Sequence, residues 1–348
     1  MFYIHKMSCI SAQKTFSGSD LSDLILSKEN KLFAVEPSYD AIPSGILRRM
    51  GKAVRLGVGA ALPLLKDGMN CQGVVLGTAN GGMEDCIKFL NQIIEYEEGV
   101  LTPTNFVQST TNAIASQIAF LTKNTGYNIT HVHGGLSFEN AMIDVMMLAA
   151  ENRNNNYLLG GVDEISDYNF NIDFLRSFYK KSITSNRELY DNASAGTIAG
   201  EGAAMFLVNG ISTNAIACVS AVKIFQNLNT SELTEYLKNF LNEQEISLVE
   251  IDLFVSGENG DNRYSHFFET SESLLPENAS IARYKHATGE FPSASAVSLW
   301  LACHFLQAQK IPAHMLKRNS NKSGFKNVLL YNNYHGLQHS FILLKRVN

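Results

Sequence analysis

The sequence predicts an α/β fold in which buried strands alternate with helices along the whole chain of 348 residues. Short apolar runs bounded by glycine have the length of buried strands. Longer stretches with apolar residues at steps of three to five have the spacing of helices that pack against a core. Alternation of these two kinds of segment is typical of sheets covered by helices.

The expected elements follow in chain order. The apolar run over 73–82 ends in a glycine-rich turn, so it predicts a buried strand and a loop. The polar run at 152–156 predicts a turn between a helix and a strand. The complete set is a strand and turn at 73–82, helices at 113–121 and 136–150, strands at 157–162 and 202–208, a helix at 231–241, a strand at 251–255, a helix at 293–307, and strands at 327–331 and 341–344.

Composition excludes several classes of protein. Apolar residues make up 45% and charged residues 18%, which indicates a folded chain with a large core. The net charge of −5 and the absence of a long basic run argue against nucleic-acid binding. The longest apolar stretches are too short to span a membrane, and the first residues lack a secretory signal, so we expect a cytoplasmic protein. Five scattered cysteines without a CxxC pair predict neither a zinc site nor a disulfide framework. No cofactor is expected.

Several segments resemble β-ketoacyl-acyl-carrier-protein synthases. Residues 194–208 contain Gly200-Glu-Gly-Ala203, similar to the family's glycine-rich strand. Residues 128–137 resemble its nucleophile elbow, and residues 158–164 resemble the strand that follows the next helix. Residues 101–113 look like the segment before the elbow, as found in the compact ketosynthase-like branch of aryl-polyene and flexirubin-type clusters. The resemblance continues through residues 285–290 and 332–338.

This resemblance implies the thiolase fold. Two pseudo-symmetric α/β halves, expected at 1–210 and 211–348, would stack as five layers in the order α-β-α-β-α. The family also forms dimers by pairing strands across a two-fold axis.

The resemblance also implies which catalytic residues are replaced. A condensing ketosynthase uses a cysteine thiolate and two histidines, and at these positions this sequence has His133, Ser256 and Glu290. The family lysine is kept as Lys285. Gly134, Tyr334, His335 and Gly336 fall at the acyl pocket and the oxyanion loop. Losing one oxyanion donor typically costs about a hundred- to thousand-fold in rate, and losing the nucleophile costs more. We therefore expect no ordinary condensation by this chain alone.

Three functions remain open. The first is a chain-length-factor-like subunit that pairs with an active ketosynthase, shapes an acyl tunnel and works with an acyl carrier protein in fatty-acid or polyketide biosynthesis. The second is a stand-alone thioester hydrolase or acyltransferase in which His133 acts with Ser137 and Glu290. The third is a homodimer that binds an acyl chain without catalysis.

Other motifs have simpler interpretations. His131 and His133 form an HxH pair without an evident third ligand, which is weak evidence for a metal. The loop at 77–82 lacks the Gly-Lys-Ser/Thr ending of a phosphate-binding loop, so it predicts a tight turn. Arg48, Arg49 and Lys52 form a basic cluster that is either a solvated helix face or a docking point for an acidic carrier protein. Cys86 is expected to be a small core residue.

Overall fold

The computed structural model describes residues 1–16, 18, 21–66, 71–320 and 324–347. Within these residues, eleven strands form one mixed sheet in the order β11-β10-β9-β12-β13-β8-β1-β7-β5-β3-β4. The strands are β1 (Phe2–Ile10), β3 (Gly73–Gly77), β4 (Tyr127–His131), β5 (Tyr157–Asp163), β7 (Gly202–Asn209), β8 (Ala217–Gln226), β9 (Leu253–Ser256), β10 (Ser280–Arg283), β11 (Leu316–Arg318), β12 (Asn327–Tyr334) and β13 (Gln338–Arg346). Two further strands, β2 (Lys31–Leu32) and β6 (Ala199–Gly200), pair with each other.

The helices are α1 (Ser44–Leu47), α2 (Lys52–Ala61), α3 (Met83–Glu95), α4 (Pro103–Gln108), α5 (Ala113–Thr122), α6 (Ser137–Glu151), α7 (Asp167–Leu175), α8 (Thr230–Glu243), α9 (Ser265–Ser273), α10 (Lys285–Thr288) and α11 (Ala294–Ala308). No helix in the described part of the chain is both long and apolar enough to cross a membrane.

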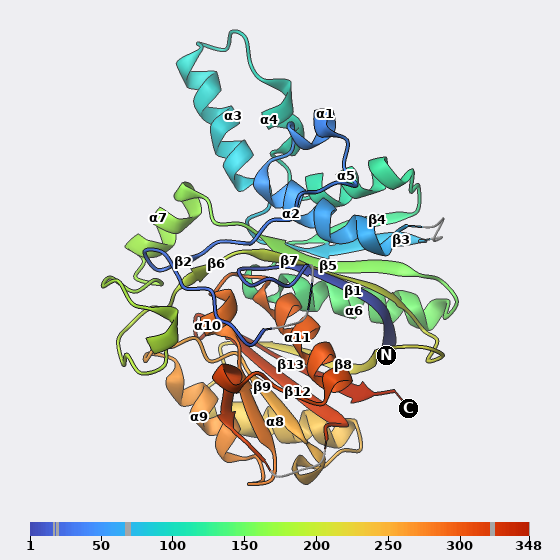
Figure 1. Ribbon diagram of the computed structural model, residues 1–348, viewed down its shortest axis with the longest axis vertical. Helices are drawn as coiled ribbons and strands as arrows, with labels where there is room; N and C mark the ends of the chain where they lie inside the picture. Colours follow the sequence, from blue (N-terminus) through green and yellow to red (C-terminus); the bar gives the residue numbers. More distant parts are fainter. Residues whose placement is uncertain (17, 19–20, 67–70, 321–323, 348) are drawn as a thin grey trace.

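These elements stack in five layers (Figure 1). Helices α2 and α5 lie on the outside of the strand group β1, β7, β5, β3 and β4, and helices α8 and α9 lie on the outside of the group β8 to β11. Helices α6 and α11 fill the layer between the two groups. The groups are joined where residues 2–4 of β1 pair with β8. The division into halves at residue 210 stays a prediction.

Side chains that alternate between the two faces of each strand explain why the structure has three large hydrophobic cores, one between the two strand groups and one under each outer helix layer. In β9, Leu253 and Val255 pack against the central helix layer, while Phe254 packs on the opposite face beneath α8 and α9. Successive side chains of a strand point to opposite faces, so a strand buried on both faces reads as a continuous apolar run. The ten elements expected from such runs and from helical spacing are confirmed, with ends shifted by a few residues. The expectation for Cys86 is wrong, because α3 has no buried residue.

Candidate functional site

The turn between β4 and α6 has the tight geometry of a strand-to-helix elbow. Gly134 has φ of +56°, a conformation that glycine adopts without strain. A Cβ atom on Gly135 would overlap the Cβ and Cγ atoms of Tyr334. The Gln338 side chain braces the turn by accepting the Gly135 N–H at 2.7 Å and donating to the His133 carbonyl at 3.1 Å. The turn therefore holds His133 in a defined position at the start of α6.

The imidazole of His133 lies between two amides. Asn140 Nδ2 is 3.0 Å from His133 Nδ1, and Gln226 Nε2 is 2.8 Å from His133 Nε2. Asn140 also donates to the Leu136 carbonyl, which orients its amide. Amides fix the direction of the ring but do not remove a proton from it, so this arrangement positions the imidazole rather than activating it as a base.

Ser137 closes the elbow. Its hydroxyl accepts the backbone N–H of His133 at 2.8 Å and donates to the Gly134 carbonyl at 2.8 Å, and the residue is fully buried. The hydroxyl hydrogen is therefore directed at the backbone and away from the His133 imidazole. In this structure Ser137, His133 and Glu290 are each bonded to other partners and do not form a Ser-His-Glu arrangement.

Ser256 ends β9 and begins an ionic network. Its buried hydroxyl donates to Glu272 Oε1 at 2.8 Å. The other oxygen of Glu272 lies 2.7 Å from Lys317 Nζ, and the same ammonium lies 2.6 Å from Glu258 Oε2. Ser256, which the sequence resemblance predicts at the place of the family's first histidine, is thus a hydroxyl that orients a carboxylate.

Glu290 belongs to a second buried network. Its Oε1 lies 2.5 Å from Lys285 Nζ, and its Oε2 accepts from Asn259 Nδ2 at 2.9 Å. Lys285 is fully buried and Glu290 is 3% exposed, so the two charges compensate each other away from water. The carboxylate of Glu290 is thus fixed in place by one cation and one amide.

Aromatic side chains fill the space beside Glu290. Tyr334 and His335 come from the turn between β12 and β13, and Phe178 and Tyr179 come from the segment after α7. The rings of Phe178 and His335 meet edge to face with centroids 3.6 Å apart. The remaining cavity has a volume of about 10 Å³, which accommodates about one water molecule and no acyl chain.

Electrostatics around this cavity keep the side chains of His335 and Tyr179 neutral. Burial, together with the positive charge of Arg176, lowers the pKa of His335 to about 3. Burial and the carboxylate of Asp173 raise the pKa of Tyr179 well above its ordinary value. The imidazole of His335 is therefore uncharged at neutral pH.

The structure brings some of the expected site residues together. Glu290, Tyr334 and His335 line one cavity. Gly336, with φ of +71°, packs against the ring of Tyr264 at the same place. His133 and Ser256 do not line this cavity, and Tyr334 stands between the elbow and Glu290.

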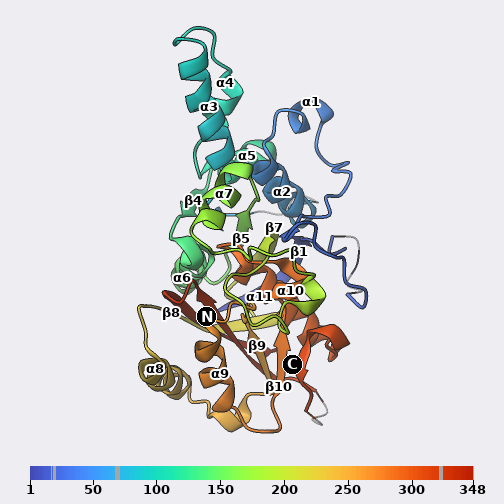
Figure 2. The ribbon, with the colours of Figure 1, turned by 90° about the vertical axis from the view of Figure 1, so that its left-hand side faces the viewer.

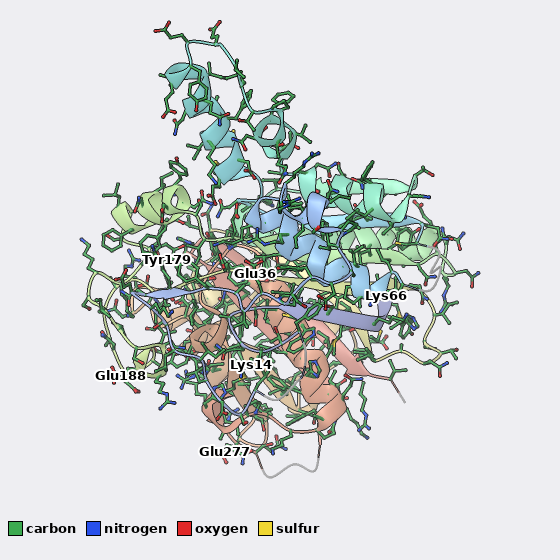
Figure 3. All side chains as sticks on the ribbon, turned by 45° about the horizontal axis from the view of Figure 1, so that its top comes forward. Lys14, Glu36, Lys66, Tyr179, Glu188 and Glu277 are labelled. Atoms are coloured by element: carbon green, nitrogen blue, oxygen red, sulfur yellow. The ribbon has the colours of Figure 1, made fainter. Side chains whose placement is uncertain are left out.

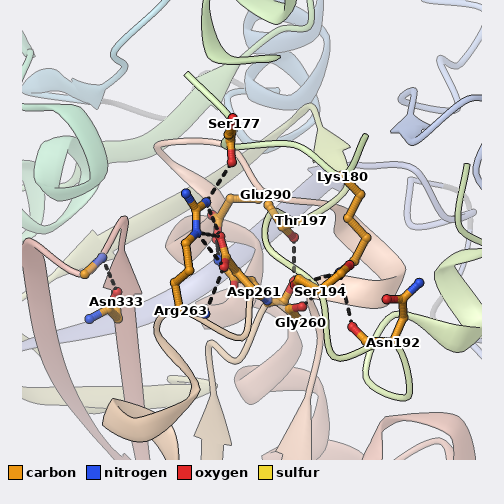
Figure 4. Close-up of polar contacts among 12 residues, drawn as sticks. Ser177, Lys180, Asn192, Ser194, Thr197, Gly260, Asp261, Arg263, Glu290 and Asn333 are labelled. Atoms are coloured by element: carbon orange, nitrogen blue, oxygen red, sulfur yellow. Dashed lines mark hydrogen bonds and ion pairs between the residues drawn. The ribbon is translucent and has the colours of Figure 1, made fainter. Parts of the chain in front are cut away.

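A clamp that sequence reasoning missed holds the segment 177–197 against the loop after β9 (Figure 4). The ammonium of Lys180, 1% exposed, binds the carbonyls of Asn192, Ser194 and Gly260 and the hydroxyl of Ser194 at 3.0–3.3 Å. Arg263 pairs with Asp261 and donates to the Ser177 carbonyl at 2.7 Å. Two adjacent lysines are typical of a solvated surface, so the sequence gives no sign of a buried ammonium. The tertiary structure shows that Lys180 is buried while Lys181 is exposed.

Two motifs have structural roles. The backbone N–H groups of Ala79 and Asn80 donate to the buried carboxylate of Asp163 at 2.9 and 2.7 Å, so an internal carboxylate occupies the place where a phosphate would bind this turn. His131 pairs with Asp144 at 2.9 Å. Among the described residues, no group of three metal-ligating side chains is assembled.

Comparisons with known proteins identify relatives of this arrangement. Residues 27–174 match the family model described as the N-terminal domain of β-ketoacyl synthase. No curated protein matches the sequence.

Solved structures match over nearly the full chain. A β-ketoacyl synthase from Burkholderia phymatum superposes with a TM-score of 0.79 at 13% identity, covering 100% of this chain and 99% of its own. The ishigamide ketosynthase/chain length factor gives 0.80 at 13% identity, with coverage of 100% and 99%. A type II polyketide ketosynthase in complex with its acyl-carrier protein gives 0.75 at 12% identity, covering 99% of both chains. At these identities the superpositions establish the fold, and they confirm the thiolase fold expected from the sequence.

Proposed function

We propose that the chain is a non-condensing, chain-length-factor-like member of the β-ketoacyl synthase superfamily. Residues 27–174 match the N-terminal domain of β-ketoacyl synthase, and the whole chain has the thiolase fold. These matches confirm the resemblance to this superfamily that the sequence predicts. The chain pairs with an active ketosynthase in the cytoplasm and contributes to an acyl tunnel. The pathway, by the resemblance of residues 101–113, makes an aryl polyene or a flexirubin-type pigment.

One observation carries this proposal: each position of the missing catalytic set is bonded into a structural network. Glu290 binds Lys285 and Asn259, Ser256 binds Glu272, and His133 lies between two amides. Condensation requires a thiolate and two imidazole donors, and this chain offers a carboxylate, a hydroxyl and an oriented imidazole in their place. Networks that satisfy these groups stabilise the fold and supply no chemistry for carbon–carbon bond formation.

The open edge of β4 supports association with another subunit. In the sheet order β4 is the last strand and pairs only with β3 among the described strands, which leaves one row of its backbone groups free. Apolar side chains around this edge are exposed, with Tyr127 at 41%, Val132 at 52% and Phe120 at 71%. An uncovered strand edge with an apolar border favours pairing with a strand of a partner.

The surface also offers a place for an acidic carrier protein. Arg48 and Arg49 are exposed, whereas Lys52 pairs with Glu201 at 2.9 Å. Of the basic cluster, these two arginines remain available for a carrier protein, and they would act mainly on its rate of association.

The test is co-expression with the ketosynthase of the same gene cluster, followed by native mass measurement and a condensation assay with malonyl-carrier protein. We expect a one-to-one complex whose condensation requires this chain and is unchanged by His133→Ala. A lone homodimer that hydrolyses acyl thioesters, and loses this activity in His133→Ala, would establish the hydrolase function instead. A homodimer that retains an acyl chain without turnover would establish the acyl-binding function.

A further inference from the structure

A pocket of about 140 Å³ lies at the far end of helix α11, between that helix and the chain that follows β1. Helix α11 runs through the middle of the molecule (Figures 1 and 2), and it begins at Ala294, shortly after Glu290. The first residue of α11 that lines the pocket is His304, about 15 Å further along the helix axis. The pocket is therefore separate from the small cavity beside Glu290.

Hydrogen bonds hold the wall of the pocket that the chain after β1 supplies. Gln13, near the start of this segment, donates to the Ala287 carbonyl at 2.7 Å, and the neighbouring Lys14 lies over the C-terminal elements in Figure 3. Further along the segment, the Leu21 carbonyl accepts from His314 Nε2 at 2.7 Å. Leu21 lines the pocket. Because this wall is already fixed, a ligand that enters the pocket does not have to order it, which favours binding.

The floor of the pocket is apolar, and its volume matches one six-membered ring. Leu21 and Phe305 are only 4% and 2% exposed, and Ala308 and Pro312 complete the apolar lining. A dry protein cavity of about 150 Å³ admits a benzene ring. The pocket thus has the volume for a single ring rather than for a long acyl chain.

Two polar side chains of the pocket have no partner among the described residues. The ring of His304 meets Trp300 edge to face, with centroids 4.0 Å apart, but within the described part of the chain neither ring nitrogen forms a hydrogen bond. Burial lowers the pKa of His304, so at neutral pH its imidazole is uncharged and has one N–H to donate. Lys310 is exposed at the mouth and forms no ion pair with any described residue. An unpaired cation beside an unused N–H donor is suited to an anionic group.

We propose that this pocket binds a small aromatic carboxylate of about the size of benzoate. The ring lies on the apolar floor beside Phe305, and the carboxylate points to the mouth, where it accepts from His304 and meets the charge of Lys310. Among the described residues, no carboxylate lines the pocket to repel such a ligand. The bound ligand connects the chain after β1 to α11. This inference does not depend on the proposed function.

The experiment measures binding of three probes to the full chain at neutral pH by calorimetry, together with the shift in melting temperature. The probes are benzoate, benzyl alcohol and benzylammonium, which share a ring and differ in charge. Ala308→Phe fills the pocket, and its control is Ala150→Phe, at an exposed position near the end of another helix. Lys310→Gln removes the cation, and its control is Lys181→Gln, at an exposed lysine outside the pocket. Melting without probe checks that all four variants are folded.

Benzoate should bind the wild type with a dissociation constant on the order of 1 mM and raise its melting temperature. Ala308→Phe should weaken benzoate binding about tenfold or more, and Lys310→Gln about threefold or more, while both controls should bind as the wild type does. Benzyl alcohol should bind about threefold or more weakly than benzoate, and benzylammonium should not bind.

Three results would overturn the proposal. The first is a wild type that does not bind benzoate at about 10 mM. The second is equal benzoate affinity in the wild type and in Ala308→Phe, which would place binding elsewhere. The third is equal affinity for benzoate and benzyl alcohol, together with wild-type benzoate affinity in Lys310→Gln, which would mean that the pocket does not recognise a carboxylate. Each of these results would leave the proposed pairing with a ketosynthase intact.

Discussion

The ammonium of Lys285 lies 2.5 Å from Glu290 Oε1 in a part of the interior where both residues are almost free of solvent contact. The sequence resemblance predicts that Lys285 is the family's lysine and that Glu290 stands in place of its second histidine, and both correspondences stay predictions. The two charges compensate each other, while Asn259 donates to Glu290 and the Tyr284 ring centroid lies 5.1 Å from the Lys285 ammonium, so changing either charge alone leaves the other buried and without its ionic partner.

Lys285→Met should therefore destabilise the fold by about 3–5 kcal/mol, since it leaves the Glu290 carboxylate unpaired in the interior. The double variant Lys285→Met/Glu290→Gln should recover most of this loss, because the remaining amide is neutral. Urea denaturation of both variants measures the difference. Equal stability of the single and double variants would show that the pair is not charged.

The contact between Gly135 and Tyr334 gives a second prediction. Gly135→Ala places a methyl group against the root of the Tyr334 side chain, which cannot rotate away, and should cost about 1–3 kcal/mol. Gly45→Ala is the matched control, because no atom lies within 4 Å of its added methyl group. The costs of Gly135→Ala and Tyr334→Ala should add to more than the cost of the double variant. Strict additivity would mean that the two residues do not touch.

Local sequence predicted the strands and helices of the core because burial on both faces leaves a continuous apolar pattern. It missed β1, although β1 is central to the sheet, because Phe2–Ile10 mixes charged and apolar residues. The assignment of His133, Ser256 and Glu290 to catalytic positions of the family stays a prediction. Local sequence could not show the bonding partners of the buried polar groups, because these partners are distant along the chain: Gln226 is 93 residues from His133, and Gly260 is 80 residues from Lys180. The apolar residues of α3 recur at helical spacing, but Cys86 is not in the core, because spacing alone does not tell a buried helix face from an exposed one.

Glu164 gives the chain a measurable pH dependence. Burial, with the nearby carboxylate of Glu84, raises the pKa of Glu164 from 4.5 to about 8. The unfolded chain loses this proton near pH 4.5 and the folded chain near pH 8, so over this range the folded state binds more protons and stability falls as pH rises. Glu164→Gln should lessen the fall of the melting temperature between pH 5 and 8 and raise the melting temperature at pH 8, while buried Glu139, whose pKa is raised to about 7, keeps its own contribution to the slope. The control Glu235→Gln, at an exposed position, should keep the wild-type slope. An unchanged slope in Glu164→Gln would assign the pH dependence to other groups.

Lys180 and Lys181 offer the sharpest test of the clamp, because they are adjacent and chemically identical but differ in burial. Lys180→Met leaves the carbonyls of Asn192, Ser194 and Gly260 without the ammonium and should cost about 2–4 kcal/mol, whereas Lys181→Met should change stability by less than about 0.5 kcal/mol. The loss should be local as well as global, since the clamp holds the segment that carries Phe178 and Tyr179 into the cavity beside Glu290. Hydrogen exchange should therefore rise in residues 177–197 of Lys180→Met and stay unchanged in Lys181→Met. Equal exchange in both variants would show that the aromatic side chains, and not the ammonium, keep this cavity closed.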